Sequence, residues 1–83
     1  MNVRRHICMP DKVLASVENS HGDHCVDIFL RPDGTYGFEE YRRDPEDNGR
    51  WQCLNRYARQ VFNSHVDAMA KAKTVVLWLR DDA

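Results

Sequence analysis

Two segments of alternating apolar and polar residues flank a Pro-Asp-Gly turn, and this pattern constrains the fold more than any other feature of the chain. Residues 26–31 read VDIFLR and residues 35–41 read TYGFEEY. Between them, Pro32 presets φ for the first turn position, Asp33 suits the second, and Gly34 takes the left-handed conformation that closes a three-residue loop with a bulge. The pattern predicts a β-hairpin.

The register of this hairpin can be predicted, because residues directly opposite each other in a sheet lie on one face. Pairing Arg31 with Thr35 gathers the apolar side chains on one face, whereas pairing Arg31 with Gly34 scatters them. We therefore expect the first register. Its largely apolar face holds the pairs Leu30–Tyr36, Ile28–Phe38, Val26–Glu40 and His24–Arg42, and its other face holds Phe29–Gly37, Asp27–Glu39 and Cys25–Tyr41.

A C-terminal helix is the second clear element. Ser64 precedes Asp67 in the Ser-x-x-Asp form of a capping box, which predicts a helix over residues 65–79. Trp78 lies roughly opposite the centre of the apolar stripe, so we expect it to be exposed or to pack against the N-terminal segment. The stripe that recurs at helical spacing consists of Ala68, Met69, Ala72, Val75, Val76 and Leu79.

Two further stretches fit both a strand and a helix. Residues 12–18 place Val13, Ala15 and Val17 on one face of a strand, which we favour over a short helix. Residues 51–62 fit a helix almost as well as a short strand near Trp51 followed by an irregular link, and we favour the strand. The fold class is therefore α+β: a small antiparallel sheet of three to four strands, formed as a meander, packed on one C-terminal amphipathic helix.

Length and composition limit the class of protein. The 83 residues fit one domain spanning 1–83, and 12 basic against 13 acidic side chains leave a net charge of −1. No apolar run approaches the ~20 residues of a membrane span, so no membrane partner is expected. Three cysteines, an odd number at wide spacing, argue against a disulfide framework and for a reducing compartment. We expect a soluble, cytoplasmic protein.

Several residue types that carry chemistry are present, but not in a pattern typical of a site. His6, Cys8, His21, His24 and Cys25 are possible metal ligands, yet their spacing matches no structural zinc site. The sequence does not say whether they meet in space. The isolated glycines form no phosphate-binding loop, and the opposed Asp27 and Glu39 favour neutralisation by a basic neighbour over acid–base catalysis. We assign no catalytic residue, metal or cofactor.

Residues 50–60 hold Arg50, Arg56 and Arg59 with Trp51 and Tyr57, and no acidic residue. Interleaved arginines and aromatics are typical of nucleic-acid binding, but equally of a solvated arginine face over core aromatics. The net charge of −1 weighs against a nucleic-acid-binding domain.

Phe29, Tyr41 and Trp78 are expected to be exposed, and large apolar side chains on the surface of so small a protein indicate a partner. The expected function is a non-enzymatic protein-interaction or self-association module, and a homodimer is one form of it. Nucleic-acid binding through Arg50, Arg56, Tyr57 and Arg59 is the alternative, followed by a small enzyme or a metal-binding protein.

Overall fold

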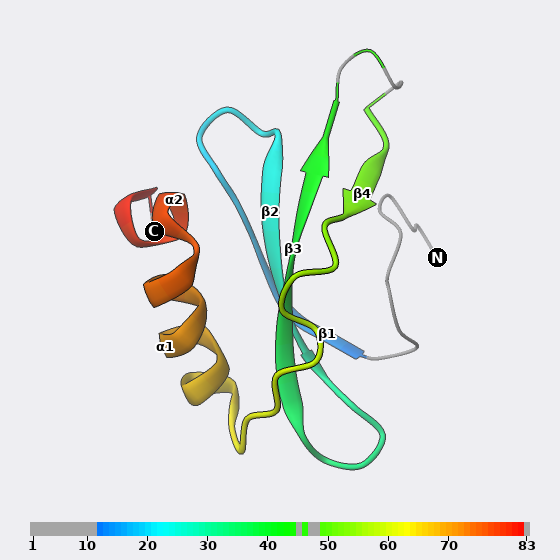
Figure 1. The fold of residues 1–83 in the computed structure, drawn as a ribbon, viewed down its shortest axis with the longest axis vertical. Helices are drawn as coiled ribbons and strands as arrows, with labels where there is room; N and C mark the ends of the chain where they lie inside the picture. The colour runs from blue at the N-terminus through cyan, green and yellow to red at the C-terminus, as the bar shows by residue number, and fades with distance from the viewer. Residues whose placement is uncertain (1–11, 45, 47–48, 83) are drawn as a thin grey trace.

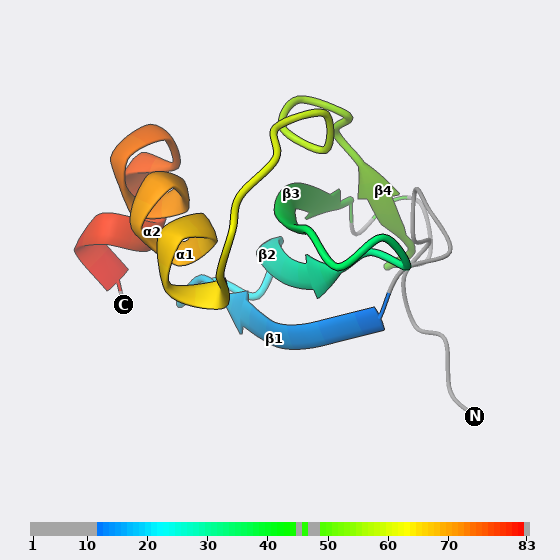
Figure 2. The ribbon, with the colours of Figure 1, turned by 90° about the horizontal axis from the view of Figure 1, so that it is seen from below.

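A computed structural model of the chain describes residues 12–44, 46 and 49–82. Its strands form one antiparallel sheet in the order β1-β2-β3-β4, and two C-terminal helices lie along one face of it (Figures 1 and 2). This confirms the predicted α+β class and the sheet-plus-helix arrangement. The elements are β1 (Lys12–Glu18), β2 (His24–Leu30), β3 (Tyr36–Arg43), β4 (Trp51–Cys53), α1 (His65–Val75) and α2 (Leu77–Asp82).

The central hairpin, β2 with β3, has the predicted register at every pair from His24–Arg42 to Leu30–Tyr36. The N–H of Arg31 donates to the carbonyl of Thr35 at 2.8 Å, which closes the loop, and Gly34 has φ +89°. Alternation therefore places Ile28 and Phe38 on the helix side of the sheet and Phe29 and Gly37 on the other.

In both ambiguous stretches, the residues for which we favoured a strand do form one. Residues 12–18 form the edge strand β1, with a bulge between Val13 and Ala15. Residues 51–53 form β4, and the chain then runs irregularly along β3 until Phe62 makes an isolated bridge with Tyr36. Along the chain, this irregular segment connects β4 to α1.

The helix begins as predicted, since the Ser64 side chain accepts the Asp67 N–H at 3.0 Å. It does not run unbroken to Leu79, however, because Val76 is extended (φ −102°, ψ 97°) and divides α1 from α2. The physical reason is local: residues 74–76 are three β-branched residues in a row, which lose side-chain freedom in a helix. The Thr74 hydroxyl also bonds the Lys71 carbonyl at 2.7 Å.

The core lies between the helices and β2 and β3. The fully buried Phe38 ring has its centroid 5.0 Å from that of Tyr57 and 5.8 Å from that of Phe62. Small side chains at Ala68 and Ala72 let α1 approach the sheet closely. The buried members are Val26, Ile28, Phe38, Ala68, Ala72, Val76 and Leu79.

On the opposite face of the sheet, the expected exposure of Phe29 and Tyr41 is wrong, since both are buried. The Arg31 guanidinium lies 5.1 Å from the Phe29 ring centroid, and both side chains fill the space above Gly37. Tyr41 packs in a second cluster with Cys25 and Trp51. Sequence alternation thus identified the face correctly but not what covers it.

The described cysteines differ in state. Cys25 carries a reduced, buried thiol, whereas Cys53 is disulfide-bonded. The disulfide contradicts the expectation drawn from the odd number of cysteines. Among the described residues, no helix is both long enough and apolar enough to span a bilayer.

Candidate functional site

Glu40 is the centre of a polar cluster on the helix-facing side of the sheet. It is 4% exposed and projects from β3, beside the apolar core. Its Oε2 atom accepts the indole N–H of Trp78 at 2.9 Å and lies 3.1 Å from Nδ1 of His24. Nη1 of Arg56 lies 3.6 Å from its Oε1. One buried carboxylate thereby holds groups from β2, α2 and the segment after β4.

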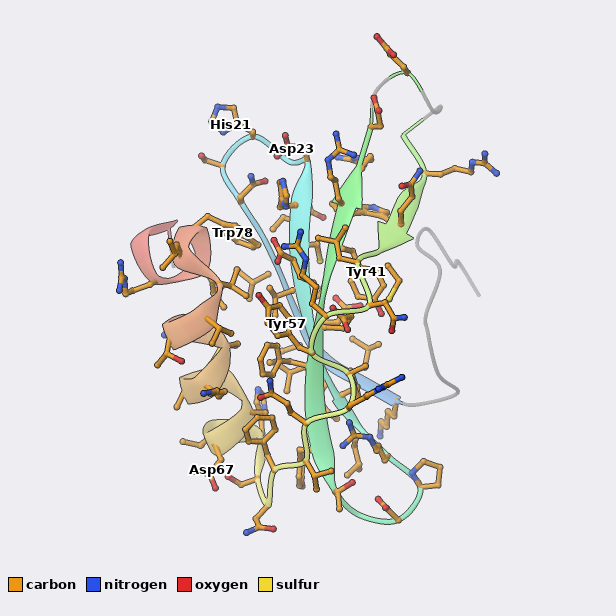
Figure 3. All side chains as sticks on the ribbon, in the orientation of Figure 1. His21, Asp23, Tyr41, Tyr57, Asp67 and Trp78 are labelled. Carbon is orange, nitrogen blue, oxygen red and sulfur yellow. The ribbon has the colours of Figure 1, made fainter. Side chains whose placement is uncertain are left out.

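Trp78 belongs to this cluster rather than to an exposed surface. It reaches from α2 toward the sheet (Figure 3), its ring centroid lies 6.3 Å from that of His24, and the residue is half-buried. Because a carboxylate only accepts hydrogen bonds, Nδ1 of His24 carries the proton in this contact. Nε2 of His24 is then the ring nitrogen left for another partner.

A row of polar residues continues from this cluster across the end of the sheet. His24 pairs with Arg42, and Arg42 pairs with Gln52, so the three side chains share one face. Arg56 approaches the same face from the segment after β4, through Glu40. Arg42, Gln52 and Arg56 are exposed, and we call His24, Arg42, Gln52 and Arg56 the polar shelf.

Glu39 is a second buried carboxylate and points to the opposite face of the sheet. Its Oε1 accepts the N–H groups of Tyr57 and Ala58, both at 2.9 Å, and its Oε2 accepts those of Arg56 and Glu40 at 3.0 and 2.8 Å. The expectation that a basic neighbour neutralises Glu39 is therefore wrong, since backbone amides donate hydrogen bonds to its carboxylate. Its role is to fix the segment that carries Arg56.

Asp27, which pairs with Glu39 in the sheet, has a different environment. Its Oδ1 accepts the Ser16 hydroxyl at 2.7 Å and the Cys25 thiol at 3.3 Å, and the residue is fully buried. The Cys25 thiol lies 3.2 Å from the Ser16 hydroxyl. The arrangement ties β1 to β2 through side chains as well as through the backbone.

In residues 50–60, the arginine side chains and the aromatic side chains occupy different environments. Arg50, Arg56 and Arg59 are exposed. Tyr57 stacks on Phe38 in the core, and Trp51 is buried with the Arg43 guanidinium 4.5 Å from its ring centroid. The arginines therefore reach solvent without the aromatic platforms expected beside them.

The histidines and cysteines do not gather in the part of the chain that the structure describes. His24 and Cys25 lie on opposite faces of β2, and no group of three His, Cys, Asp or Glu side chains lies close enough to hold a metal ion among the described residues. His6 and Cys8 lie outside those residues. The described cluster presents arginine guanidinium groups and a histidine ring, which are donors of hydrogen bonds.

Two carboxyl groups, a half-buried one at Asp23 and an exposed one at Asp33, are stabilised in the charged form by hydrogen bonds. The Asn19 amide donates to Asp23 at 2.7 Å and lowers the pKa of Asp23 below its usual 3.8. The hydroxyl and N–H of Thr35 donate to Asp33 at 2.7 and 3.0 Å and lower the pKa of Asp33 below 3.8. Both groups belong to turns and support the hairpins that carry the polar shelf.

Comparison with protein families, curated proteins and solved structures gives no match for this chain.

Proposed function

We propose that this protein is a non-enzymatic interaction module that self-associates through the outer face of its C-terminal helices. The observation that carries the proposal is the location of exposed apolar side chains. Among the described residues, large hydrophobic side chains are exposed at Leu14, Val61, Val66 and Leu77, and three of these four lie within residues 61–77. Val66 and Leu77 are 75% and 61% exposed.

Exposed residues of both helices define the surface that we propose for association. Within α1, Ala68 and Ala72 are buried, and residues 66, 70 and 73 lie on the opposite side of the helix by the 3.6-residue period. Leu77 begins α2 after the extended residue Val76, and residues 66, 70, 73 and 77 are all exposed. We call Val66, Ala70, Lys73 and Leu77 the outer stripe.

A second copy of the chain is the occupant that fits this stripe. In an antiparallel pair of helices, a two-fold axis midway between positions 66 and 77 brings Val66 of one copy opposite Leu77 of the other and Ala70 opposite Lys73, and the small Ala70 side chain lets the backbones approach. The two apolar ends of the stripe are therefore self-complementary.

Sedimentation equilibrium tests the proposal. Because a contact between two short helices is small, we expect a dimer with a dissociation constant of about 10–100 μM, and a monomer for the Val66→Lys, Leu77→Lys double variant. Leu14→Lys is the matched control, since it removes an exposed apolar side chain from β1 and leaves the helices unchanged. A wild-type protein that stays monomeric at 500 μM (about five times the upper end of that range), or a Leu14 variant that loses the dimer equally, contradicts the proposal.

Nucleic-acid binding is the second candidate, supported by the exposure of Arg50, Arg56 and Arg59. If it is correct, the protein binds a single-stranded oligonucleotide at low salt, and Arg56→Glu with Arg59→Glu abolishes a binding that weakens as salt increases. No binding at low salt eliminates this candidate.

The cytoplasm is the proposed location, on the ground of the odd number of cysteines and the reduced thiol of Cys25. The disulfide at Cys53 argues in the other direction. Alkylation of thiols in intact cells decides the matter: modification of Cys53 supports the cytoplasm, and protection that is reversed by a reductant contradicts it.

A further inference from the structure

We propose that the polar shelf is a binding site for a phosphate group, formed by His24, Arg42 and Arg56 over the buried carboxylate of Glu40. The site is separate from the outer stripe. It is built on the sheet, and its binding does not depend on self-association.

The shelf carries more positive charge than its carboxylate neutralises. The Arg42 side chain forms no hydrogen bond or ion pair with any described residue. Among the described residues, the Arg56 side chain is engaged only by Glu40, at 3.6 Å, and it is 59% exposed. The one carboxylate of Glu40 is therefore paired with the guanidinium of Arg56 and leaves that of Arg42 without a counter-charge among the described residues. Each guanidinium offers five N–H donors in a planar fork that matches the oxygens of a phosphate, and most of these donors face solvent.

Glu40 also fixes the orientation of the third group. Its Oε2 holds Nδ1 of His24 at 3.1 Å, so Nε2 is directed away from the carboxylate. The side chain of His24 is 30% exposed, and no described residue contacts Nε2 through a hydrogen bond. A carboxylate behind a histidine is a common means of orienting the second ring nitrogen toward a ligand.

The backbone brings these groups within reach of one ligand. His24 and Arg42 are direct cross-strand partners, whose Cβ atoms are about 5 Å apart in a sheet. Arg56 is tied to the same carboxylate, and the backbone around it is fixed by the hydrogen bonds of Glu39. The cations are thus held by a rigid sheet and an anchored segment, which lowers the entropy lost when they bind an anion.

A phosphate group is favoured over a long nucleic acid by the surroundings. The aromatic side chains that would stack on bases are buried, in the case of Trp51, or packed on Phe38, in the case of Tyr57. The net charge of −1 also provides no extended positive surface. One phosphate with local contacts fits the shelf better than a polyanion.

Inorganic phosphate is the probe, and the indole N–H resonance of Trp78 is the reporter, because this group bonds Glu40 directly. In a ¹H–¹⁵N titration of the full chain at constant ionic strength, we expect a saturable shift of that resonance and of the His24 ring. In the Arg42→Gln, Arg56→Gln double variant we expect the apparent affinity to fall at least about tenfold. The matched control is Arg50→Gln with Arg59→Gln, which removes two exposed arginines outside the shelf.

Three further comparisons identify the source of the response. A phosphoserine peptide and a short oligodeoxynucleotide show whether a single phosphate or a polyanion is preferred, and equal binding per phosphate supports the proposal. A response equal to that of sodium chloride, or one that survives the double variant, overturns it. Stronger binding of the oligonucleotide that requires Arg50 and Arg59 also overturns it, in favour of the nucleic-acid candidate. The Val66→Lys, Leu77→Lys variant should bind phosphate as the wild type does, which separates failure of this site from failure of self-association.

Discussion

Adjacent glutamates in β3 serve opposite faces of the sheet and are stabilised in different ways. Glu39 accepts four backbone N–H groups, whereas Glu40 accepts from the side chains of Trp78 and His24 and lies near Arg56. A buried carboxylate without such donors would be strongly destabilising. The local pattern Phe-Glu-Glu-Tyr therefore depends on residues far along the chain.

The Glu39→Gln substitution should be destabilising, because an amide has one acceptor oxygen and its NH₂ group would face two backbone donors. We expect the free energy of unfolding in urea to fall by about 3 kcal/mol. Glu46→Gln, at an exposed position, is the control and should leave the unfolding midpoint unchanged. Equal stability of the two variants would show that Glu39 does not anchor the segment after β4.

Asp23 and Asp33 predict how stability depends on acid pH. Each has a folded-state pKa below 3.8, so the unfolded chain binds protons more readily than the folded one does. Their stabilising contributions are present above about pH 4 and are lost as the pH falls through the lowered pKa values. In Asn19→Ala, an NMR titration should show the pKa of Asp23 returning toward 3.8 while that of Asp33 is unchanged. A parallel rise of both pKa values would contradict the assignment to local hydrogen bonds.

At this scale the sequence predicts where side chains point but not what they meet. Alternation in the hairpin correctly put Glu40 on the helix side and Glu39 on the other. It could not reveal that Trp78, 38 residues away, donates to Glu40, because that contact depends on where the helix docks. The backbone donors to Glu39 come from an irregular segment, with Asn55 at φ 57°, which has no periodic signal.

Among the elements, the central hairpin depends on the absence of a side chain at Gly37. A Cβ atom there would lie 2.7 Å from Cε1 of Phe29 and 2.6 Å from Nη2 of Arg31. The flexible arginine can move, but the buried Phe29 ring has little room. Arg31 in turn donates to the carbonyls of Tyr36, Ala58 and Gln60, which joins the hairpin loop to the segment that leads to α1.

Gly37→Ala should therefore lower the free energy of unfolding by about 2 kcal/mol through crowding. The control is a double-mutant cycle with Phe29→Leu, in which the smaller side chain should reduce the cost of the added methyl group. An unchanged cost in the Phe29→Leu background would show that the ring is not the source of the crowding.

Elements with local signals were predictable, and those decided by packing were not. The Ser64 cap and the strand alternation of β2 and β3 are local and are found as predicted. The end of α1 at Val75 was missed, since the apolar stripe continues across the break and only the run of β-branched residues indicates it. Residues 51–62 stayed ambiguous because β4 is only three residues long.

At the scale of the molecule, we propose two surfaces for partners on the part of the chain that the structure describes. The polar shelf occupies the helix-facing side of the sheet beyond Glu40, and the outer stripe occupies the solvent side of the helices. The sequence indicated a sheet face with Phe29 and Tyr41 as the apolar surface, but both residues are buried in this structure. The exposed apolar residues used in the proposal are instead on the helices. The association proposed for the helices is the central claim.

Mixed-label NMR tests that claim most directly. Uniformly ¹³C-labelled chains are mixed with unlabelled chains at a concentration where the dimer is populated, and only contacts between chains are detected. The account predicts intermolecular NOEs between the methyl groups of Val66 and those of Leu77, and between the Ala70 methyl group and the Lys73 side chain. A dimer whose intermolecular NOEs come from β1 or from the other face of the sheet, with none at the outer stripe, would contradict it.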